Sequence, residues 1–271
     1  MNLLYTVERQ QPLVGGVLVK RYKRFLADVK LDDGRVVTAH CANTGSMERL
    51  ALPGTRVWLE PVAEDSSRKL KWSWILAELD DGMYGVDTGY PNRMTGELLR
   101  QNKLPFLGEW AVVRPEQKYG VNSRVDFLLE NPVAIPLAEK AMSTLYLEIK
   151  NCHLRYPDGY GYFPDSTGAR ATKHLHELSA MTAQSGVGAA VMFFAQVPHL
   201  VAVRPSDVHD AEFASVARDV ARGGVRFFAL QAKHSRDCTE FYGPIPVDLA
   251  PYDVAPILAW RQQWKSAATS K

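Results

Sequence analysis

The pattern of apolar residues and turns changes near residue 83, and this change constrains the fold more than any other feature of the sequence. Before it, short strand-like segments alternate with turn signals such as Asp32-Asp33-Gly34 and Pro53-Gly54. The strands expected in this part cover residues 18–31, 36–42, 56–62 and 69–79. Several short strands joined by regular turns predict a small closed sheet, and a five-stranded OB-type β-barrel fits the length.

After residue 83, strands alternate with helices. A connector, residues 83–104, holds a short helix over 95–102 that Thr95 caps. The elements that follow are expected at 124–130, 145–150, 189–196 and 225–233 for strands and at 172–185 and 207–222 for helices. The order β-β-α-β-α-β predicts a mixed sheet flanked by helices, so that the chain as a whole is an α/β (α+β) protein.

The second of these helices and a last one near the C-terminus have clear signals. Asp207 is the expected N-cap of the former, and Gly223 ends it. Pro256 begins the latter, in which Trp260 and Trp264 are four residues apart and are expected to pack on the main body. We therefore expect domains at 1–82 and 83–249 and a helical extension at 250–271.

Composition limits the class of protein without identifying it. A net charge of +2 is too small to indicate nucleic-acid binding by itself, and 46% hydrophobic residues are enough for a buried core. The three cysteines form no CxxC pair, which excludes a thiolate zinc motif and suits the reducing cytoplasm. The N-terminus has no pattern of a signal peptide, and no apolar run is long enough to span a membrane.

Two apolar, strand-like segments are each interrupted by one acidic residue, although a strand in a protein core usually carries no charge. In 145–151, Glu148 and Lys150 are two residues apart and therefore point to the same face of a strand. In 123–129, Asp126 interrupts a similar apolar run. If the two strands are neighbours, the two carboxylates repel each other unless a divalent cation lies between them.

An acid on one strand followed by Glu-x-Lys on the next is typical of the PD-(D/E)xK nucleases. Their chemistry requires oxygen ligands for Mg²⁺, an activated water and a cation beside the scissile phosphate. Taken alone, however, Glu-x-Lys on a strand also forms ordinary solvated cross-strand pairs, and that alternative stays open at this point.

Nine motifs, in order over most of the chain, resemble the sugar fermentation stimulation protein A (SfsA) family. They are Arg21-Tyr22-Lys23-Arg24-Phe25, Asn43-Thr44-Gly45-Ser46-Met47, Thr88-Gly89-Tyr90-Pro91-Asn92, Lys118-Tyr119-Gly120, Ser123-Arg124-Val125-Asp126-Phe127, Glu148-Ile149-Lys150-Asn151, Phe163-Pro164-Asp165, Lys173-His174-Leu175-His176-Glu177-Leu178 and Pro246-Val247-Asp248-Leu249. The sequence departs from the family in a longer stretch at 131–144 and in a tail after Leu249.

The resemblance implies an N-terminal OB-like domain, a C-terminal PD-(D/E)xK nuclease-like domain and DNA binding, with a regulatory link to sugar (maltose) use in bacteria. Carried over to this sequence, Asp126, Glu148 and Lys150 form the catalytic core, and Asp126 and Glu148 are the ligands of Mg²⁺ or Mn²⁺. Glu116 occupies the place of an extra acid before the first core strand; the alternative is a surface acid in a turn.

Basic residues beside aromatic rings extend the prediction to nucleic-acid contacts, because cations bind phosphates and rings stack on bases. The alternative is a solvated barrel edge with its aromatic side chains in the core. Lys173 shares a helix face with Glu177, which allows either a phosphate contact or an ordinary ion pair. The residues predicted to contact nucleic acid are Arg21, Lys23, Arg24, Asn43, Ser46, Arg124 and Lys173.

Three hypotheses for function follow. In the first, the protein binds double- or single-stranded DNA and cleaves it with Mg²⁺; Asp126, Glu148 and the Ile149 carbonyl hold the metal, Lys150 activates water and Glu116 assists. In the second, it is a non-catalytic DNA-binding regulator linked to sugar metabolism. In the third, its substrate is RNA.

Overall fold

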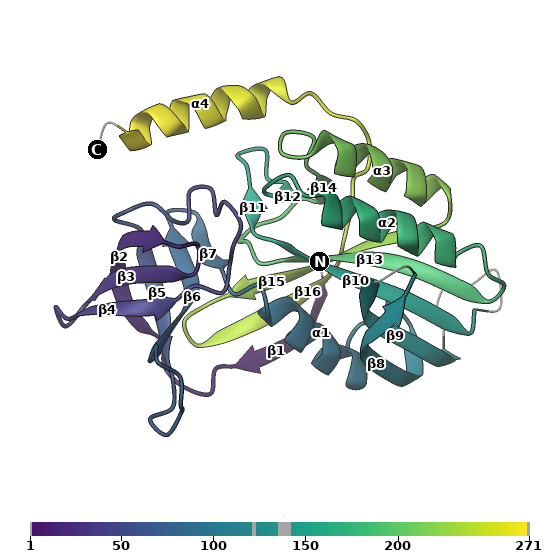
Figure 1. Cartoon of the computed structure of the whole chain (residues 1–271), viewed down its shortest axis with the longest axis horizontal. Coiled ribbons are helices and arrows are strands. Elements are labelled where there is room, and N and C mark those ends of the chain that lie inside the picture. Colours follow the sequence, from purple (N-terminus) through teal and green to yellow (C-terminus); the bar gives the residue numbers. More distant parts are fainter. Residues whose placement is uncertain (1, 121–122, 135–141, 270–271) are drawn as a thin grey trace.

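The computed structural model describes residues 2–120, 123–134 and 142–269. Its strands form a six-stranded sheet, a seven-stranded sheet and a small three-stranded sheet. In Figure 1 the six-stranded sheet lies at one side and the seven-stranded sheet with its helices at the other. Among the described residues, no helix is long and apolar enough to cross a membrane.

The six-stranded sheet is the expected barrel. Its strands are β2 (Val14–Tyr22), β3 (Leu26–Leu31), β4 (Val36–His40), β5 (Arg56–Pro61), β6 (Trp72–Leu79) and β7 (Gly82–Gly85). A further pairing of His40 on β4 with Ser73 on β6 closes β2 to β6 into a barrel. The prediction of an OB-like barrel is confirmed.

One predicted strand of the barrel is wrong. Residues 18–31 form two strands, β2 and β3, that pair as a hairpin. At the turn between them, Lys23 and Arg24 have left-handed backbones, with φ of 49° and 64°. The apolar pattern continues through the turn, so periodicity alone did not reveal it.

The seven-stranded sheet has the order β1-β16-β15-β13-β10-β9-β8. Its strands are β1 (Asn2–Glu8), β8 (Glu109–Tyr119), β9 (Ser123–Ala134), β10 (Thr144–Cys152), β13 (Val187–Ala195), β15 (Arg226–His234) and β16 (Cys238–Ile245). The central strands β10, β13 and β15 are parallel, whereas β9 and β16 run antiparallel to their neighbours. This is the mixed sheet that the sequence predicted.

Helices cover both faces of this sheet. Alternate residues of β13 point to opposite faces: Val191 and Phe193 pack with α2 (Ala169–Met181) and α3 (Ala211–Arg222), whereas Met192 and Phe194 pack with α1 (Tyr90–Arg100). Figure 1 shows α2 and α3 on one side of the sheet and α1 on the other.

Three boundaries differ from the sequence prediction. Residues 2–8, expected in the N-terminal domain, form β1 at the edge of the seven-stranded sheet, where they pair with β16. α1 begins at Tyr90 rather than at residue 95, because Pro91 fits the first turn of a helix. Asp210 caps α3, accepting a hydrogen bond from the Phe213 amide over 2.9 Å, while Asp207 is paired with Arg218.

The C-terminal helix connects the two parts of the molecule. In α4 (Ala255–Thr269), Ile257 and Trp260 pack with Tyr156 and Tyr162 near the small sheet of β11 (Leu154–Arg155), β12 (Gly161–Phe163) and β14 (Val203–Pro205). Arg261 forms an ion pair of 2.6 Å with Glu48, which lies between the barrel strands β4 and β5. Trp260 and Trp264 stack with ring centroids 6.4 Å apart, and both are half-buried.

A part of the long stretch 131–144 that departs from the family pattern, residues 135–141, lies outside the described residues. On either side of it, β9 reaches Ala134 and β10 begins at Thr144.

Candidate functional site

The two acidic strands are neighbours in the seven-stranded sheet. β9 and β10 pair antiparallel, and Leu147 of β10 lies opposite Phe127 of β9. One step further along both strands, Asp126 and Glu148 are therefore side by side on the same face. The prediction that the sheet brings these two acids together is confirmed by this register.

Asp126 is held by two hydrogen bonds. Its Oδ1 accepts from the side-chain amide of Asn92 on α1 and its Oδ2 accepts from the backbone N–H of Ile149, each over 2.6 Å. These bonds fix the carboxylate against the next strand. The second lone pair of each oxygen remains for a further ligand.

Glu148 has an uneven set of partners. Its Oε1 accepts from Lys150 Nζ over 2.7 Å and lies 2.5 Å from His174 Nδ1 on α2. Its Oε2 is buried and has no hydrogen-bond partner among the described residues. Glu148 as a whole is only 3% exposed. Burying a carboxylate oxygen without a hydrogen-bond partner costs free energy, so Oε2 is a candidate ligand for a cation.

The pKa values of the two acids move in opposite directions. Burial and the neighbouring charge of Glu148 raise the pKa of Asp126 to about 6. Burial also disfavours the charged form of Glu148, but Lys150 and His174 outweigh it and lower the pKa of that carboxyl. At neutral pH both groups are therefore ionised, and Asp126 is the one close to taking up a proton.

Glu116 lies on β8 beside this pair. Pro115 is opposite Phe127 and Gln117 is opposite Val125, which places Glu116 across from Asp126. Its backbone is left-handed, with φ of 54°, an unusual conformation for a residue other than glycine, asparagine or aspartate. Its side chain lines the same cleft as the two core acids.

The acids open into a cleft of about 620 Å³, called here the acidic cleft. Its wall includes Arg124 of β9 and Lys173 of α2, both predicted from sequence, as well as Arg170. The lining residues are Glu116, Ser123, Arg124, Asp126, Glu148, Ala169, Arg170, Lys173 and His174. Cations around a carboxylate pair are suited to an anionic ligand that also contacts a metal.

The donor set fits a small, hard cation. No group of three or more histidine, cysteine, aspartate or glutamate side chains gathers as ligands in the described part of the chain. Mg²⁺ does not require such a group, since it commonly uses one or two carboxylates and keeps several waters. Asp126, with spare lone pairs, and Glu148, through Oε2, supply such a pair.

Three residues of the site were not among those predicted. Asn92 falls in the connector ahead of the helix expected at residues 95–102, and its contact with Asp126 joins residues 34 apart in sequence. His174 lies on α2, inside one of the family motifs, and its contact with Glu148 joins residues 26 apart in sequence. Tyr119 is buried against Tyr146, its hydroxyl has no hydrogen-bond partner among the described residues, and burial with the charge of Glu148 raises its pKa far above the usual value.

The residues predicted to contact nucleic acid in the barrel fall into two groups. Lys23 and Arg24 are exposed at the β2–β3 turn, where they are accessible to a phosphate backbone. Arg21 donates instead to the backbone carbonyls of Arg24, Asn43 and Gly45. Arg21 therefore holds these loop carbonyls in place, and its direct contact with nucleic acid stays a prediction.

Asn43 and Ser46 lie in the loop that meets the C-terminal domain. Asn43 is buried and accepts from the Gly45 amide over 2.8 Å. Ser46 donates to Asp165, whose carboxylate also contacts His153 over 3.2 Å. These contacts join the barrel to the C-terminal domain, and a direct contact with nucleic acid stays a prediction for both residues.

Family comparisons cover most of the chain. Residues 19–86 match the SfsA N-terminal OB domain, and residues 89–238 match the sugar fermentation stimulation protein RE domain. A sugar fermentation stimulation protein homolog from Roseobacter denitrificans is 41% identical over 242 residues, covering 89% of this chain and 99% of the relative. A homolog from Rhizobium rhizogenes is 37% identical over 257 residues, covering 95% and 97%.

A solved structure has the same fold. SfsA from Pyrococcus furiosus, determined in complex with Ca²⁺, superposes with a TM-score of 0.76 over 92% of this chain and 100% of its own. The two sequences are 22% identical, so this likeness concerns the fold.

Proposed function

This chain belongs to the sugar fermentation stimulation protein family, and we propose that it binds DNA and hydrolyses phosphodiester bonds in its acidic cleft with Mg²⁺ or Mn²⁺. The observation that carries the proposal is the buried Oε2 of Glu148, which lies beside Asp126 and has no hydrogen-bond partner in the part of the chain that the structure describes. A bound cation would satisfy that oxygen and relieve the repulsion between the carboxylates.

Each residue has a role that its position supports. Asp126 and Glu148 would hold the metal, which when bound would act as a Lewis acid and lower the pKa of water. Lys150, next to Glu148, would orient the attacking water or neutralise charge that builds on the phosphate. Glu116 assists from β8, and Arg124, Arg170 and Lys173 bind the backbone of the nucleic acid at the rim.

Two further observations support parts of the proposal. The structure of the Pyrococcus relative was determined in complex with Ca²⁺, and the pair Asp126 and Glu148 of this chain suits a divalent cation as well. The three cysteines are free, which agrees with a protein of the reducing cytoplasm.

The test is cleavage of linear, nicked and single-stranded DNA with Mg²⁺ or Mn²⁺. Lys150→Ala is expected to lose activity by about a hundredfold or more while DNA binding survives. The matched control is Lys233→Ala, an exposed lysine outside the cleft. If the wild type cleaves none of these substrates, nor RNA, with either metal, the catalytic proposal is overturned.

One observation favours a second function, a non-catalytic DNA-binding regulator linked to sugar (maltose) metabolism. Lys150 is only 8% exposed and is held by Glu148, so it is partly withdrawn from a substrate. In that case the wild type binds DNA with an affinity that falls steeply with salt but does not cleave it.

A further inference from the structure

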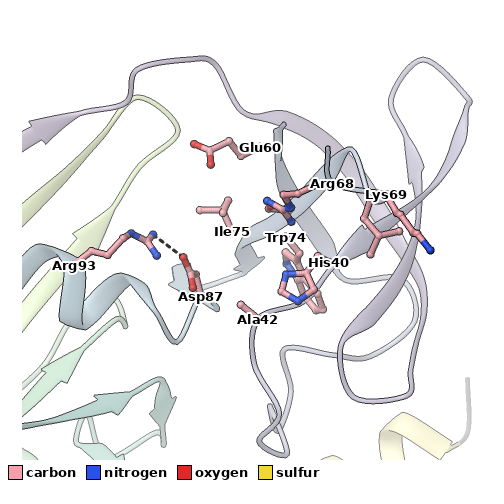
Figure 2. Close-up of a pocket in the computed structure, with 11 residues that line it drawn as sticks. His40, Ala42, Glu60, Arg68, Lys69, Trp74, Ile75, Asp87 and Arg93 are labelled. Atoms are coloured by element: carbon pink, nitrogen blue, oxygen red, sulfur yellow. Dashed lines mark hydrogen bonds and ion pairs between the residues drawn. The ribbon is translucent and has the colours of Figure 1, made fainter. Parts of the chain in front are cut away.

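A second cavity lies between the barrel and the start of α1 and takes no part in the acidic cleft. Figure 2 shows this cavity, called here the barrel cavity, with side chains from β4 and β6 on one side and from α1 on the other. Its volume is about 720 Å³, enough for a nucleotide. The lining residues are His40, Ala42, Glu60, Arg68, Lys69, Leu70, Ser73, Trp74, Ile75, Asp87 and Arg93.

Two cations mark one end of the barrel cavity. Arg68 and Lys69 are exposed on the loop that precedes β6. Within the described residues, neither side chain forms an ion pair or a hydrogen bond. Such cations are suited to a phosphate group from outside the chain, because no carboxylate of the described residues forms an ion pair with them.

The inner wall is less polar than the end with the two cations. His40, Ala42 and Ile75 are half-buried there, and Trp74 lies behind them. The indole N–H of Trp74 donates to the Leu76 carbonyl over 2.8 Å, which fixes that ring. A planar imidazole beside apolar groups is a surface on which a base can pack without sequence preference.

The opposite wall connects the barrel cavity to the acidic site. Asp87 and Arg93 form an ion pair of 2.8 Å, drawn dashed in Figure 2. Asn92, the residue before Arg93 on α1, is the partner of Asp126. The Asp87 carbonyl accepts from Gln196, whose amide also donates to Asn151, the residue after Lys150. Both connections run from a cavity wall to the strand pair that carries the acids.

We propose that the barrel cavity binds one nucleotide of a single-stranded nucleic acid, with its phosphate at Arg68 and Lys69 and its base against His40 and Ile75. The proposal rests on the proposed function for the identity of the polymer, and it adds the form that is bound. It concerns binding alone, so it holds or fails whether or not the acidic cleft cleaves.

The test measures binding of a fluorescent eight-nucleotide single-stranded DNA to the full chain by anisotropy in EDTA, which prevents cleavage. The double variant Arg68→Ala/Lys69→Ala is expected to bind about tenfold more weakly or worse, and the salt dependence should fall by about 0.7 in slope for each lost phosphate contact. The control Lys30→Ala/Lys233→Ala removes the same charge from exposed positions outside the cavity. If both double variants lose the same affinity for the oligonucleotide, the loss comes from the net charge of the protein, and the proposal is overturned.

A second variant tests the cavity itself without a change of charge. Ala42→Phe fills the inner part, and it is compared with wild type by circular dichroism and thermal unfolding to establish that it folds. Weakened binding by folded Ala42→Phe supports insertion of a base. If Ala42→Phe binds as tightly as wild type, insertion of a base into the cavity is overturned. This holds even if Arg68 and Lys69 are needed for binding, since the strand would then only cross the rim.

Free nucleotides distinguish the source of the ligand. Calorimetric titration with dAMP and dTMP is expected to give weaker binding than the oligonucleotide, because only one unit of the chain is present. If a mononucleotide binds tightly and the oligonucleotide does not bind, the cavity is still a nucleotide site, but its ligand is a free nucleotide. No binding of either probe contradicts the proposal.

Discussion

Asn92 on α1 donates a hydrogen bond of 2.6 Å to Asp126 on β9, and so ties the helix that begins the C-terminal domain to the candidate metal site. The bond stabilises the charged form of the carboxylate and lowers the pKa of Asp126 against the effect of burial. It also orients the oxygen that would face a cation. Such supporting residues contribute to metal affinity without touching the metal.

Replacing Asn92 by alanine is therefore expected to weaken Ca²⁺ or Mg²⁺ binding by about tenfold. The lost hydrogen bond leaves Asp126 less oriented and easier to protonate. Calorimetric titration with each metal at pH 7 measures the effect. Gln101→Ala, at the exposed end of the same helix, serves as the control, and an equal loss there would argue against a specific role.

The pKa of Asp126 predicts a dependence of stability on pH. Its pKa is about 6 in the folded protein and 3.8 as the ordinary value, so between these pH values the unfolded chain loses a proton that the folded chain keeps. The free energy of unfolding in EDTA should fall as pH rises from 4 to 6, by about 2 kcal/mol from this group.

Urea unfolding of wild type and Asp126→Asn over this range checks the sign. The variant should lack this part of the decline, whereas Asp237→Asn, an exposed control, should keep it. A wild type that gains stability relative to Asp126→Asn from pH 4 to 6 would contradict the raised pKa.

Metal binding should depend on pH through the same group. Below about pH 6 a cation must displace a proton from Asp126, so affinity is expected to fall by up to about tenfold for each pH unit. Titrations with Ca²⁺ between pH 5 and 8 measure this. A flat profile across pH 6 would mean that Asp126 is not a ligand.

His174 is expected to stabilise the site through Glu148. Its Nδ1 lies 2.5 Å from Glu148 Oε1, and both side chains are buried. His174→Ala leaves Lys150 as the partner of that oxygen and should lower the free energy of unfolding by about 2 kcal/mol, the scale for a hydrogen bond to a charged group. His176→Ala, exposed on another face of α2, should change it by less than about 0.5 kcal/mol. If both variants change the free energy of unfolding by similar amounts, the predicted role of His174 at Glu148 is wrong.

Arg261 is expected to hold α4 against the barrel. Its partner Glu48 has a side chain only 6% exposed, so Arg261→Ala leaves a buried carboxylate without its cation and should cost about 3 kcal/mol. The exposed pair of Arg222 and Asp219, with side chains 74% and 59% exposed, gives the matched control, for which Arg222→Ala should cost under about 1 kcal/mol. Denaturant unfolding measures both, and hydrogen exchange in residues 255–265 shows whether the helix detaches. Protection unchanged from wild type would contradict the prediction.

The sequence by itself determined the elements whose apolar pattern is regular. It predicted the barrel, the mixed sheet and the strands that carry Asp126 and Glu148, because alternation along a strand decides which residues share a face. The strand register then follows from the same pattern, since a slip of one residue would expose the apolar set.

Only the tertiary structure decided what lies against those strands. β1 joins the far sheet, Asn92 meets Asp126, and His174 meets Glu148, although each pair is separated by many residues. Such contacts depend on how helices and sheets pack, and no local periodicity encodes them. The barrel cavity has the same origin, because its two walls come from elements that approach each other only in the folded chain.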